Sequence, residues 1–238
     1  MRDVHSRRPG DAFAELGRIR FSETDFEGVL TLVAELAKRT IPAAGEVSVT
    51  LLGAGGAYTP ACTGETALTL DNWQYEYGHG PCLTAAAAAI TVTVADMADE
   101  TRWPQWANRA VDAGVRSSLS IGLPLHESVT GALNVYATEP DAFDEDAVAL
   151  GQAFGGYAAV AMANAHLYST KADLAQHMQA AMASRAVIEQ AKGIIMAERR
   201  CTPEEAFALL TKISQDTNRK VRDIAAALVA RTQDTREP

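Results

Sequence analysis

The chain reads SRAVIEQAKGIIM at residues 184–196, TPEEAFALL at 202–210 and NRKVRDIA at 218–225, and these stretches decide the fold of its last third. In the first and the third stretch, apolar residues recur every three or four positions, which predicts amphipathic helices. In the second, Thr202 stands three residues before Glu205 with a proline between them. This is the pattern of a capping box at a helix start. The sequence therefore predicts three helices separated by two short breaks.

A long helical pattern leads into these stretches. No proline occurs between Pro140 and residue 202, and the acidic run at 144–146 suits a helix N-terminus. Apolar residues stand seven apart at Ala153, Val160, Leu167, Leu174, Ala181, Ile188 and Ile195. Such a repeat is typical of a coiled coil, so we expect a helical stalk and a parallel homodimer through it. The alternative is two helices, one on each domain, whose apolar phases coincide.

The first 140 residues mix short alternating segments with helical ones. Residues 1–20 show no clear period and are expected to form a flexible arm that contains at most a helical turn. Ser22 is the expected cap of a helix with apolar spacing from Phe26 to Ala37. The expected strands are 47–52, 67–70, 91–94, 117–125 and 131–136, the last two forming a hairpin, and the expected helices are 82–90 and 103–114. This order predicts an α+β fold, an antiparallel sheet with flanking helices.

Charge is divided unevenly along the chain. The net charge is −9, with 11 Lys/Arg against 22 Asp/Glu in residues 1–173 and 10 against 8 in residues 174–238. An acidic front and a mildly basic tail favour different roles for the two parts. Three cysteines without a CxxC pair or a Cys/His cluster argue against a disulfide framework and a metal site. We see no signal peptide and no membrane span, so we expect a cytoplasmic protein.

The three stretches of the tail resemble the ANTAR domain in residue types and in spacing. The resemblance covers essentially the whole tail. It implies a three-helix output domain that binds paired RNA hairpins, usually as a dimer, and acts in transcription antitermination.

The front half resembles a GAF domain. The resemblance rests on Gly80-Pro81-Cys82, Asp96, Arg102-Trp103-Pro104, Gly114-Val115-Arg116-Ser117, Pro124-Leu125 and Gly131-Ala132-Leu133-Asn134-Val135-Tyr136. It implies a sensor with a small-molecule pocket and does not name the ligand or a cofactor. The expected domains are a GAF-like sensor at 21–168, a helical linker at 169–183 and an ANTAR-like domain at 184–238.

Basic side chains of the tail are the candidates for RNA contact, because phosphate contacts dominate nucleic-acid affinity. Arg185 and Lys192 stand seven apart on one flank of the first helix, and further cations open the third helix, where a bound phosphate would reverse their unfavourable dipole energy. The candidates are Arg185, Lys192, Lys212, Arg219, Lys220 and Arg222. The alternative is surface charge paired with Glu189 and Glu198. The aromatic Phe207 is expected in the core, so stacking on bases is not predicted.

Few side chains of the sensor are suited to chemistry. His79 and Cys82 lie in or beside a glycine-rich loop, and Tyr77 and Trp103 are aromatic residues that line either a pocket or the core. These four are the candidates for ligand contact, and no catalytic or metal-binding set is predicted. Two further hypotheses stay open: a DNA-binding regulator, and a GAF-fold cysteine redox sensor or methionine sulfoxide reductase that uses Cys62 and Cys82.

Overall fold

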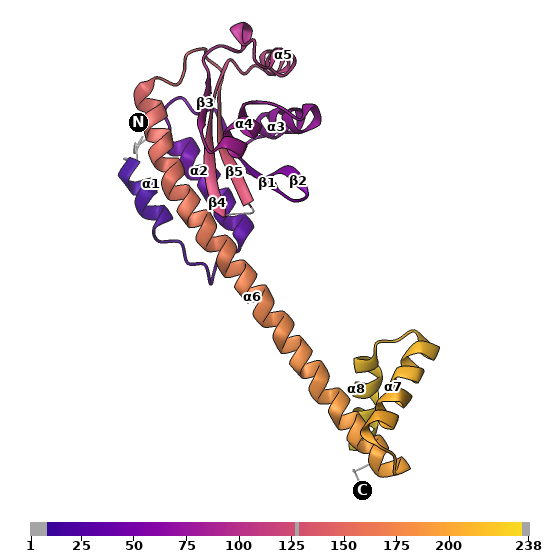
Figure 1. Cartoon of the computed structure of the whole chain (residues 1–238). Coiled ribbons are helices and arrows are strands. Elements are labelled where there is room, and N and C mark those ends of the chain that lie inside the picture. Colours follow the sequence, from indigo (N-terminus) through magenta and orange to yellow (C-terminus); the bar gives the residue numbers. More distant parts are fainter. Residues whose placement is uncertain (1–8, 127–128, 235–238) are drawn as a thin grey trace. The chain divides into compact units, whose positions relative to one another are not determined.

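The computed structural model describes residues 9–126 and 129–234, and the chain forms two compact units (Figure 1). We call residues 1–169 the sheet unit and residues 170–238 the helical unit. The long helix α6 (Glu145–Arg199) contributes residues to both. Each unit has its own hydrophobic core, so each is described by itself.

The sheet unit is built on five antiparallel strands in the order β2-β1-β5-β4-β3. In the central strand, Val135 lies opposite Val47 of β1 and Leu119 of β4. The predicted hairpin is confirmed as β4 and β5, and residues 127 and 128 lie outside the described residues. The strands are β1 (Glu46–Gly53), β2 (Gly56–Cys62), β3 (Thr91–Val94), β4 (Ser117–His126) and β5 (Val129–Ala137).

Helices cover both faces of the sheet (Figure 1). Strand residues alternate, so that Val47 and Val49 enter one apolar core with helices α1, α2 and the first part of α6. The opposite face packs against α3, α4 and α5 around Trp106 and Tyr136. The α+β class predicted from the sequence is therefore confirmed. The helices of this unit before α6 are α1 (Pro9–Leu16), α2 (Phe26–Thr40), α3 (Glu65–Tyr77), α4 (Pro81–Ala88), the short 3-10 helix η1 (Met97–Asp99) and α5 (Pro104–Asp112).

Glycines let two helices approach the sheet closely. A Cβ atom at Gly122 of β4 would lie 2.2 Å from the Ala85 carbonyl oxygen of α4. On the other face, a Cβ atom at Gly155 of α6 would lie 2.9 Å from Ile121. Backbone contact at Gly122 fixes α4, which carries one wall of the sensor pocket described below.

The N-terminal segment is more ordered than the sequence predicted. Residues 9–16 form α1, which is longer than the helical turn that the prediction allowed, and its Ala12 and Leu16 are buried on the core, so this part is not a flexible arm. Residues 1–8 lie outside the described residues. The cap of α2 is also corrected: Asp25, not Ser22, accepts a hydrogen bond of 2.8 Å from the Gly28 amide. Asp25 and Ser22 both carry a side-chain oxygen that can cap a helix, and Asp25, which lies directly before the first helical residue, is the cap.

The predicted strand at 67–70 is wrong, because these residues belong to α3. The buried positions of this helix are Ala67, Leu70, Asp71 and Gln74, a helical spacing that includes two polar residues. The strand that follows β1 is instead β2, which the sequence analysis missed. It is an edge strand with Pro60, and its register with β1 shifts between Val49 and Leu51, as a proline at a bulge allows.

The helical unit consists of the end of α6, α7 (Pro203–Thr217) and α8 (Val221–Asp234). The continuous helix predicted for the stalk and the three helices of the tail are confirmed. The predicted capping box is present, since the Glu205 amide donates to Thr202 Oγ1 (3.2 Å) and the Thr202 amide donates to Glu205 Oε2 (2.9 Å). Within the described residues, no helix has an apolar stretch of the length that a bilayer requires.

Candidate functional site

The core of the helical unit is small and positions the basic residues around it. Ala191 and Ile195 of α6 pack against Ala206 and Leu210 of α7 and against Ala225 of α8, all of them buried. Helices as short as α7 (15 residues) and α8 (14 residues) are marginal alone, so their orientation depends on this shared core. It leaves the flanks of all three helices exposed for contact with a partner.

The turn between α7 and α8 holds its cations in a fixed backbone. Asn218 adopts a left-handed conformation (φ 52°), which Asn tolerates better than most residues. The amide of Arg219 donates to the Ser214 carbonyl oxygen (3.2 Å), and the Ser214 hydroxyl donates back to the Arg219 carbonyl oxygen. Arg219 and Lys220 are both exposed at the start of α8.

The candidate RNA-binding cations differ in solvent exposure and in ion pairing. Exposed side chains are found at Arg185, Lys212, Arg219, Lys220 and Arg222. The Lys192 side chain is only 17% exposed, and its ammonium lies 3.0 Å from Glu189. Arg222 lies 3.4 Å from the Asp223 carboxylate. The row expected along α6 is thus partly neutralised at Lys192, whereas the turn presents Arg219 and Lys220.

Phe207 differs from its predicted place in the core. Its side chain is 45% exposed on α7, so the helical unit does present an aromatic ring to its surroundings. The sequence pattern missed this because Phe207 directly follows the buried Ala206 and shares its apolar run.

The sheet unit contains a hollow of about 630 Å³ between the β1–β2 end, α3 and α4. Of the four predicted ligand residues, His79 lines it, beside Tyr75, Leu83 and Thr84. The Tyr77 ring stacks on the His79 ring at a centroid distance of 6.0 Å. The structure thus brings Tyr77 beside His79, but of these two residues only His79 lines the hollow, which we call the sensor pocket.

The other two predicted ligand residues lie in the core. Cys82 is fully buried, and its amide donates to Gln74 Oε1 (2.8 Å). Trp103 packs in the same apolar cluster beneath the Arg102 guanidinium, which lies 4.6 Å from its ring centroid. Within the described residues, neither side chain lines the sensor pocket.

Behind the sensor pocket lies a buried hydrogen-bond network that the sequence analysis missed. Asp71 accepts a bond from the Tyr136 hydroxyl (2.5 Å) and one from Thr59 Oγ1 (2.8 Å). The Tyr75 hydroxyl bonds to Thr59 (2.6 Å) and to Thr50 (2.9 Å). Tyr75 therefore connects the sensor pocket to a fully buried carboxyl group. We call Asp71 and these four partners the Asp71 network.

Burial governs the acidity of this network. It raises the pKa of the Asp71 carboxyl from 3.8 to about 6, although the hydrogen bonds from Ser48, Tyr136 and Thr59 lower it. Burial and then the charge of Asp71 raise the pKa of the Cys82 thiol well above its ordinary value. A thiol held in its neutral form is a poor nucleophile.

Three polar atoms beside the network are buried without a hydrogen-bond partner in the part of the chain that the structure describes. They are Ser118 Oγ, Ser120 Oγ and Asn134 Oδ1. Asn134 donates its amide hydrogens to Thr50 (2.9 Å) and Ser48 (3.2 Å), which leaves its oxygen free to accept. Unpaired buried polar atoms are costly, so this face of the sheet is suited to a polar ligand or to water.

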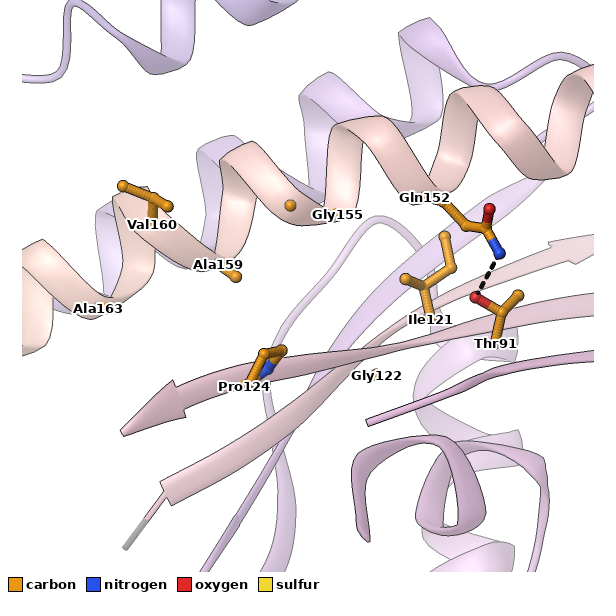
Figure 2. Close-up of a pocket in the computed structure, with 10 residues that line it drawn as sticks. Thr91, Ile121, Gly122, Pro124, Gln152, Gly155, Ala159, Val160 and Ala163 are labelled. Atoms are coloured by element: carbon orange, nitrogen blue, oxygen red, sulfur yellow. Dashed lines mark hydrogen bonds between the residues drawn. The ribbon is translucent and has the colours of Figure 1, made fainter. Parts of the chain in front are cut away.

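A second hollow, of about 410 Å³, lies between α6 and the β3–β4 edge of the sheet (Figure 2). The Gln152 amide donates to the Thr91 hydroxyl (3.0 Å) at one end, and small residues such as Gly155 and Ala159 form the α6 side. Val160 stands at its border and is 62% exposed. The residues that line this hollow are uncharged.

Among the described residues, no cluster of three or more His, Cys, Asp or Glu side chains could hold a metal ion. The candidate sites that the structure offers are the sensor pocket and the basic surface of the helical unit.

Comparison with known proteins identifies both units. The family model of the GAF domain matches residues 23–163, more than half of the chain. The chain belongs to the GAF domain family. The family model of the ANTAR domain matches residues 176–229, so an ANTAR domain follows the GAF domain. This is the architecture of a signal-regulated ANTAR-type regulator.

Solved structures support the GAF fold at low sequence identity. The reduced form of fRMsr from Staphylococcus aureus has 18% identity and a TM-score of 0.52, covering 68% of this chain and 99% of that one. The phycocyanobilin-bound GAF domain of a cyanobacterial phytochrome has 16% identity and a TM-score of 0.51, covering 67% and 96%.

A type II free methionine-R-sulfoxide reductase from Thermoplasma acidophilum has 15% identity and a TM-score of 0.45, covering 60% and 95%. The comparison with curated proteins finds no match. The two likenesses with TM-scores above 0.5 support the fold of the GAF domain and leave its ligand open.

Proposed function

We propose that the chain is a cytoplasmic, homodimeric regulator whose ANTAR domain binds paired RNA hairpins in transcription antitermination, under the control of a small molecule bound by its GAF domain. The ANTAR match over the helical unit carries this proposal. It is supported by exposed cations fixed at the α7–α8 turn, where a phosphate would meet a helix N-terminus. The domain limits proposed are 21–168 for the sensor, 169–183 for the linker and 184–238 for the ANTAR domain.

The RNA-contacting residues proposed are Arg185, Lys192, Lys212, Arg219, Lys220 and Arg222. We place Arg219 and Lys220 first, because they are exposed on a backbone held by Ser214. Lys192 ranks last, because binding RNA would require it to leave Glu189. Exposed Phe207 adds an aromatic surface on which a base could stack.

An apolar stripe on α6 supports the homodimer. Val160, Leu167 and Leu174 stand seven apart and are 62%, 50% and 59% exposed. Ile195, at the end of the same repeat, is instead buried in the core of the helical unit. The proposed seam therefore runs over residues 160–174, and a second copy of α6 would cover it.

The signal is proposed to bind in the sensor pocket against His79 and Tyr77. Tyr75 lines the pocket and shares a hydrogen bond with Thr59, which donates to Asp71. A ligand that competes for the Tyr75 hydroxyl would change the bonding of a buried carboxyl. Cys82 and Trp103 take part through packing, since both are buried.

The cysteine hypotheses gain no support from the site. A nucleophilic or redox-sensing thiol requires access and thiolate character, whereas Cys82 is buried and its pKa is raised. We infer that the protein is a regulator and not an enzyme.

The first experiment compares tandem-hairpin RNA, single-hairpin RNA and duplex DNA at physiological salt. We expect the wild-type chain to prefer the tandem RNA. Arg219→Ala/Lys220→Ala should weaken that binding by at least about tenfold and flatten the dependence of log K on log salt by about 1.5, since two phosphate contacts are lost.

The matched control is Arg18→Ala/Arg20→Ala, which removes the same charge from exposed positions in the sheet unit and should bind RNA like the wild type. A preference of the wild type for duplex DNA would support the DNA-binding alternative. Equal weak binding to all three nucleic acids would contradict an RNA-binding output.

A further inference from the structure

Val160 belongs both to the hollow between α6 and the β3–β4 edge and to the proposed dimer seam. It lines the hollow, which has a volume of about 410 Å³, and is 62% exposed. In Figure 2 the Ala159 side chain points toward β4, whereas Val160 points away from the sheet. We call this hollow the α6 hollow. Its volume lies in the range of pockets that hold small ligands, about 300–1,000 Å³, so it has room for an aromatic side chain.

The exposed residues of α6 in the sheet unit show which side of the helix a second copy would cover. Tyr157 and Val160 are 61% and 62% exposed, and Leu167, seven residues after Val160, is 50% exposed. This spacing places Tyr157 at heptad position a, and Val160 and Leu167 at position d. Ala163 is then a g residue on one flank of the seam, and Tyr168 is an e residue on the other flank.

The two flanks of this seam have opposite shapes. The flank of Ala163 lines the α6 hollow together with other small residues such as Gly156. The opposite flank carries Tyr168, whose large side chain is 47% exposed. At about 100° per residue, Ala163 lies about 60° to one side of Val160 and Tyr168 about 80° to the other. A hollow flank and an aromatic flank are therefore complementary.

A twofold axis along the seam brings the unlike flanks of two copies together. In a parallel pair of helices, g residues of one copy lie opposite e residues of the other, and the next e residue follows a g residue after five positions. Ala163 and Tyr168 are five residues apart. The Tyr168 ring of a second copy would therefore meet the α6 hollow at Ala163, and by symmetry the same contact would form twice.

Charge favours a second copy over the terminal segments of the chain as the occupant of the α6 hollow. The residues that line the hollow are uncharged. Residues 1–8 contain three arginines and one aspartate, and residues 235–238 contain one arginine and one glutamate. Burying a charge without a partner is costly, so a neutral tyrosine ring fits the hollow better than either segment.

The β4 side of the α6 hollow is in contact with the helix that walls the sensor pocket. Gly122 of β4 lines the hollow, and a Cβ atom at Gly122 would lie 2.2 Å from the Ala85 carbonyl oxygen of α4. The Gly122 amide donates to the carbonyl oxygen of Ile90, just beyond α4 (2.9 Å). Ala87, on the same helix, lines the sensor pocket. A ligand that moves α4 would thus also move the backbone of the α6 hollow.

We propose that the α6 hollow receives the Tyr168 ring of a second copy, and that this contact couples the sensor pocket of one copy to α6 of the other. The inference rests on the proposed function, from which it takes the homodimer and the sensor pocket. It names the contact through which the two copies act on each other. A ligand in one copy would then change how the long helix of its partner is held.

The first test places a photoreactive aromatic residue, p-azidophenylalanine, at position 168 of the full chain. After illumination we expect covalent dimers in which mass spectrometry joins this position to Pro124, Ala159 or Ala163 of the hollow. Mixing with an isotope-labelled chain distinguishes joins between copies from joins within one copy. The matched control has the same residue in place of Tyr58, which is 54% exposed on β2 and should not join the hollow.

The second test measures the dissociation constant of the dimer by sedimentation. Tyr168→Ala should raise this constant by at least about tenfold, as expected for an aromatic residue buried at an interface. Its circular dichroism spectrum should match that of the wild type, because the side chain is half-exposed within one copy.

A variant that fills the sensor pocket tests the coupling. Ala87→Trp places a ring in the pocket, and Ala88→Trp, on an exposed neighbour outside the pocket lining, is its control. We expect Ala87→Trp to change the dissociation constant of the dimer by at least about fivefold, the lower end of ordinary coupling. In the Tyr168→Ala background, Ala87→Trp and Ala88→Trp should behave alike.

Each negative result has a distinct meaning. If the chain sediments as a dimer but position 168 joins only residues outside the hollow, or none, the contact is overturned and the hollow is left to a small ligand. An effect of Ala87→Trp that persists in the Tyr168→Ala background, or that is absent from both backgrounds, would overturn the coupling. A monomeric wild-type chain would overturn the proposed homodimer as well, whereas a dimer without the Tyr168 contact would overturn this inference alone.

Discussion

At the scale of single residues, the Asp71 network carries the most unusual chemistry of the chain. Asp71 is fully buried, and its bonded partners Tyr136 and Thr59 are hydroxyls, which can donate or accept. The network can therefore adapt to either protonation state of the carboxyl. In the unfolded chain the same group would titrate near its ordinary pKa of 3.8.

The free energy of unfolding should consequently depend on pH through Asp71. Because the folded pKa is raised to about 6, the folded chain binds a proton that the unfolded chain releases between pH 4 and 6. This stabilisation is complete below about pH 4 and is lost as pH rises through 6, a change on the order of 3 kcal/mol. Urea unfolding at a series of pH values should show it.

Asp71→Asn is the matched variant for that measurement. It keeps the shape of the side chain and removes the titration, so the difference in stability between wild type and variant should change between pH 4 and 6. A difference that stays constant over this range would show that Asp71 does not take up the proton on folding.

The sequence predicts some residues of the candidate sites, but it does not predict Asp71. His79 could be placed at a pocket because it lies in a glycine-rich loop, and Arg219 at a helix start because a turn precedes it. Asp71 could not, because its role depends on Thr59 of β2 and Tyr136 of β5, which only tertiary packing brings to it.

At the scale of helices and strands, the elements that were predicted correctly have local sequence motifs at their ends. The helix α7 was predicted with its cap, because Thr202 and Glu205 form a local motif. The segment 67–70 was predicted as a strand, because four residues alone do not show the helical burial that extends to Gln74. Strand β2 was missed because it contains Pro60, which only an edge position tolerates.

Gly193 offers a test of what approaches α6. A Cβ atom at this exposed mid-helix position would meet no described atom of the chain within 4 Å. Gly193→Ala should therefore raise the free energy of unfolding by about 1 kcal/mol, as helix propensity dictates. Circular dichroism during urea unfolding of the full chain measures this change.

The same variant should be assayed for RNA binding and for dimerisation. Lower affinity in a more stable protein would indicate that RNA or a second copy approaches Gly193 closely. A less stable variant would contradict the open surroundings of this residue.

At the scale of the whole molecule, the long helix α6 contributes residues to both compact units. The proposed seam at 160–174 lies on it, and so do Arg185 and Lys192 of the proposed RNA-contacting residues. Each added residue turns a helix by about 100°. A single alanine inserted after Leu174 should therefore change the direction of the ANTAR domain relative to the seam, while leaving both cores intact.

We expect this one-residue insertion to lower the affinity for tandem-hairpin RNA by at least about tenfold and to leave the dimer unchanged in sedimentation. A seven-residue helical insertion at the same place preserves the phase and should retain the RNA affinity. Equal behaviour of the two insertions would contradict transmission through a continuous helix.

The stretch of α6 after residue 169 is almost entirely exposed up to residue 186 and adds little to either core. A gene that recombines within this stretch can exchange one sensor for another without harming the fold of either product. Such an exchange must preserve the angular phase of the helix between the two domains. Among the descendants of such crossovers, lengths that differ by multiples of seven residues should persist, even where the sensors themselves share no ancestry.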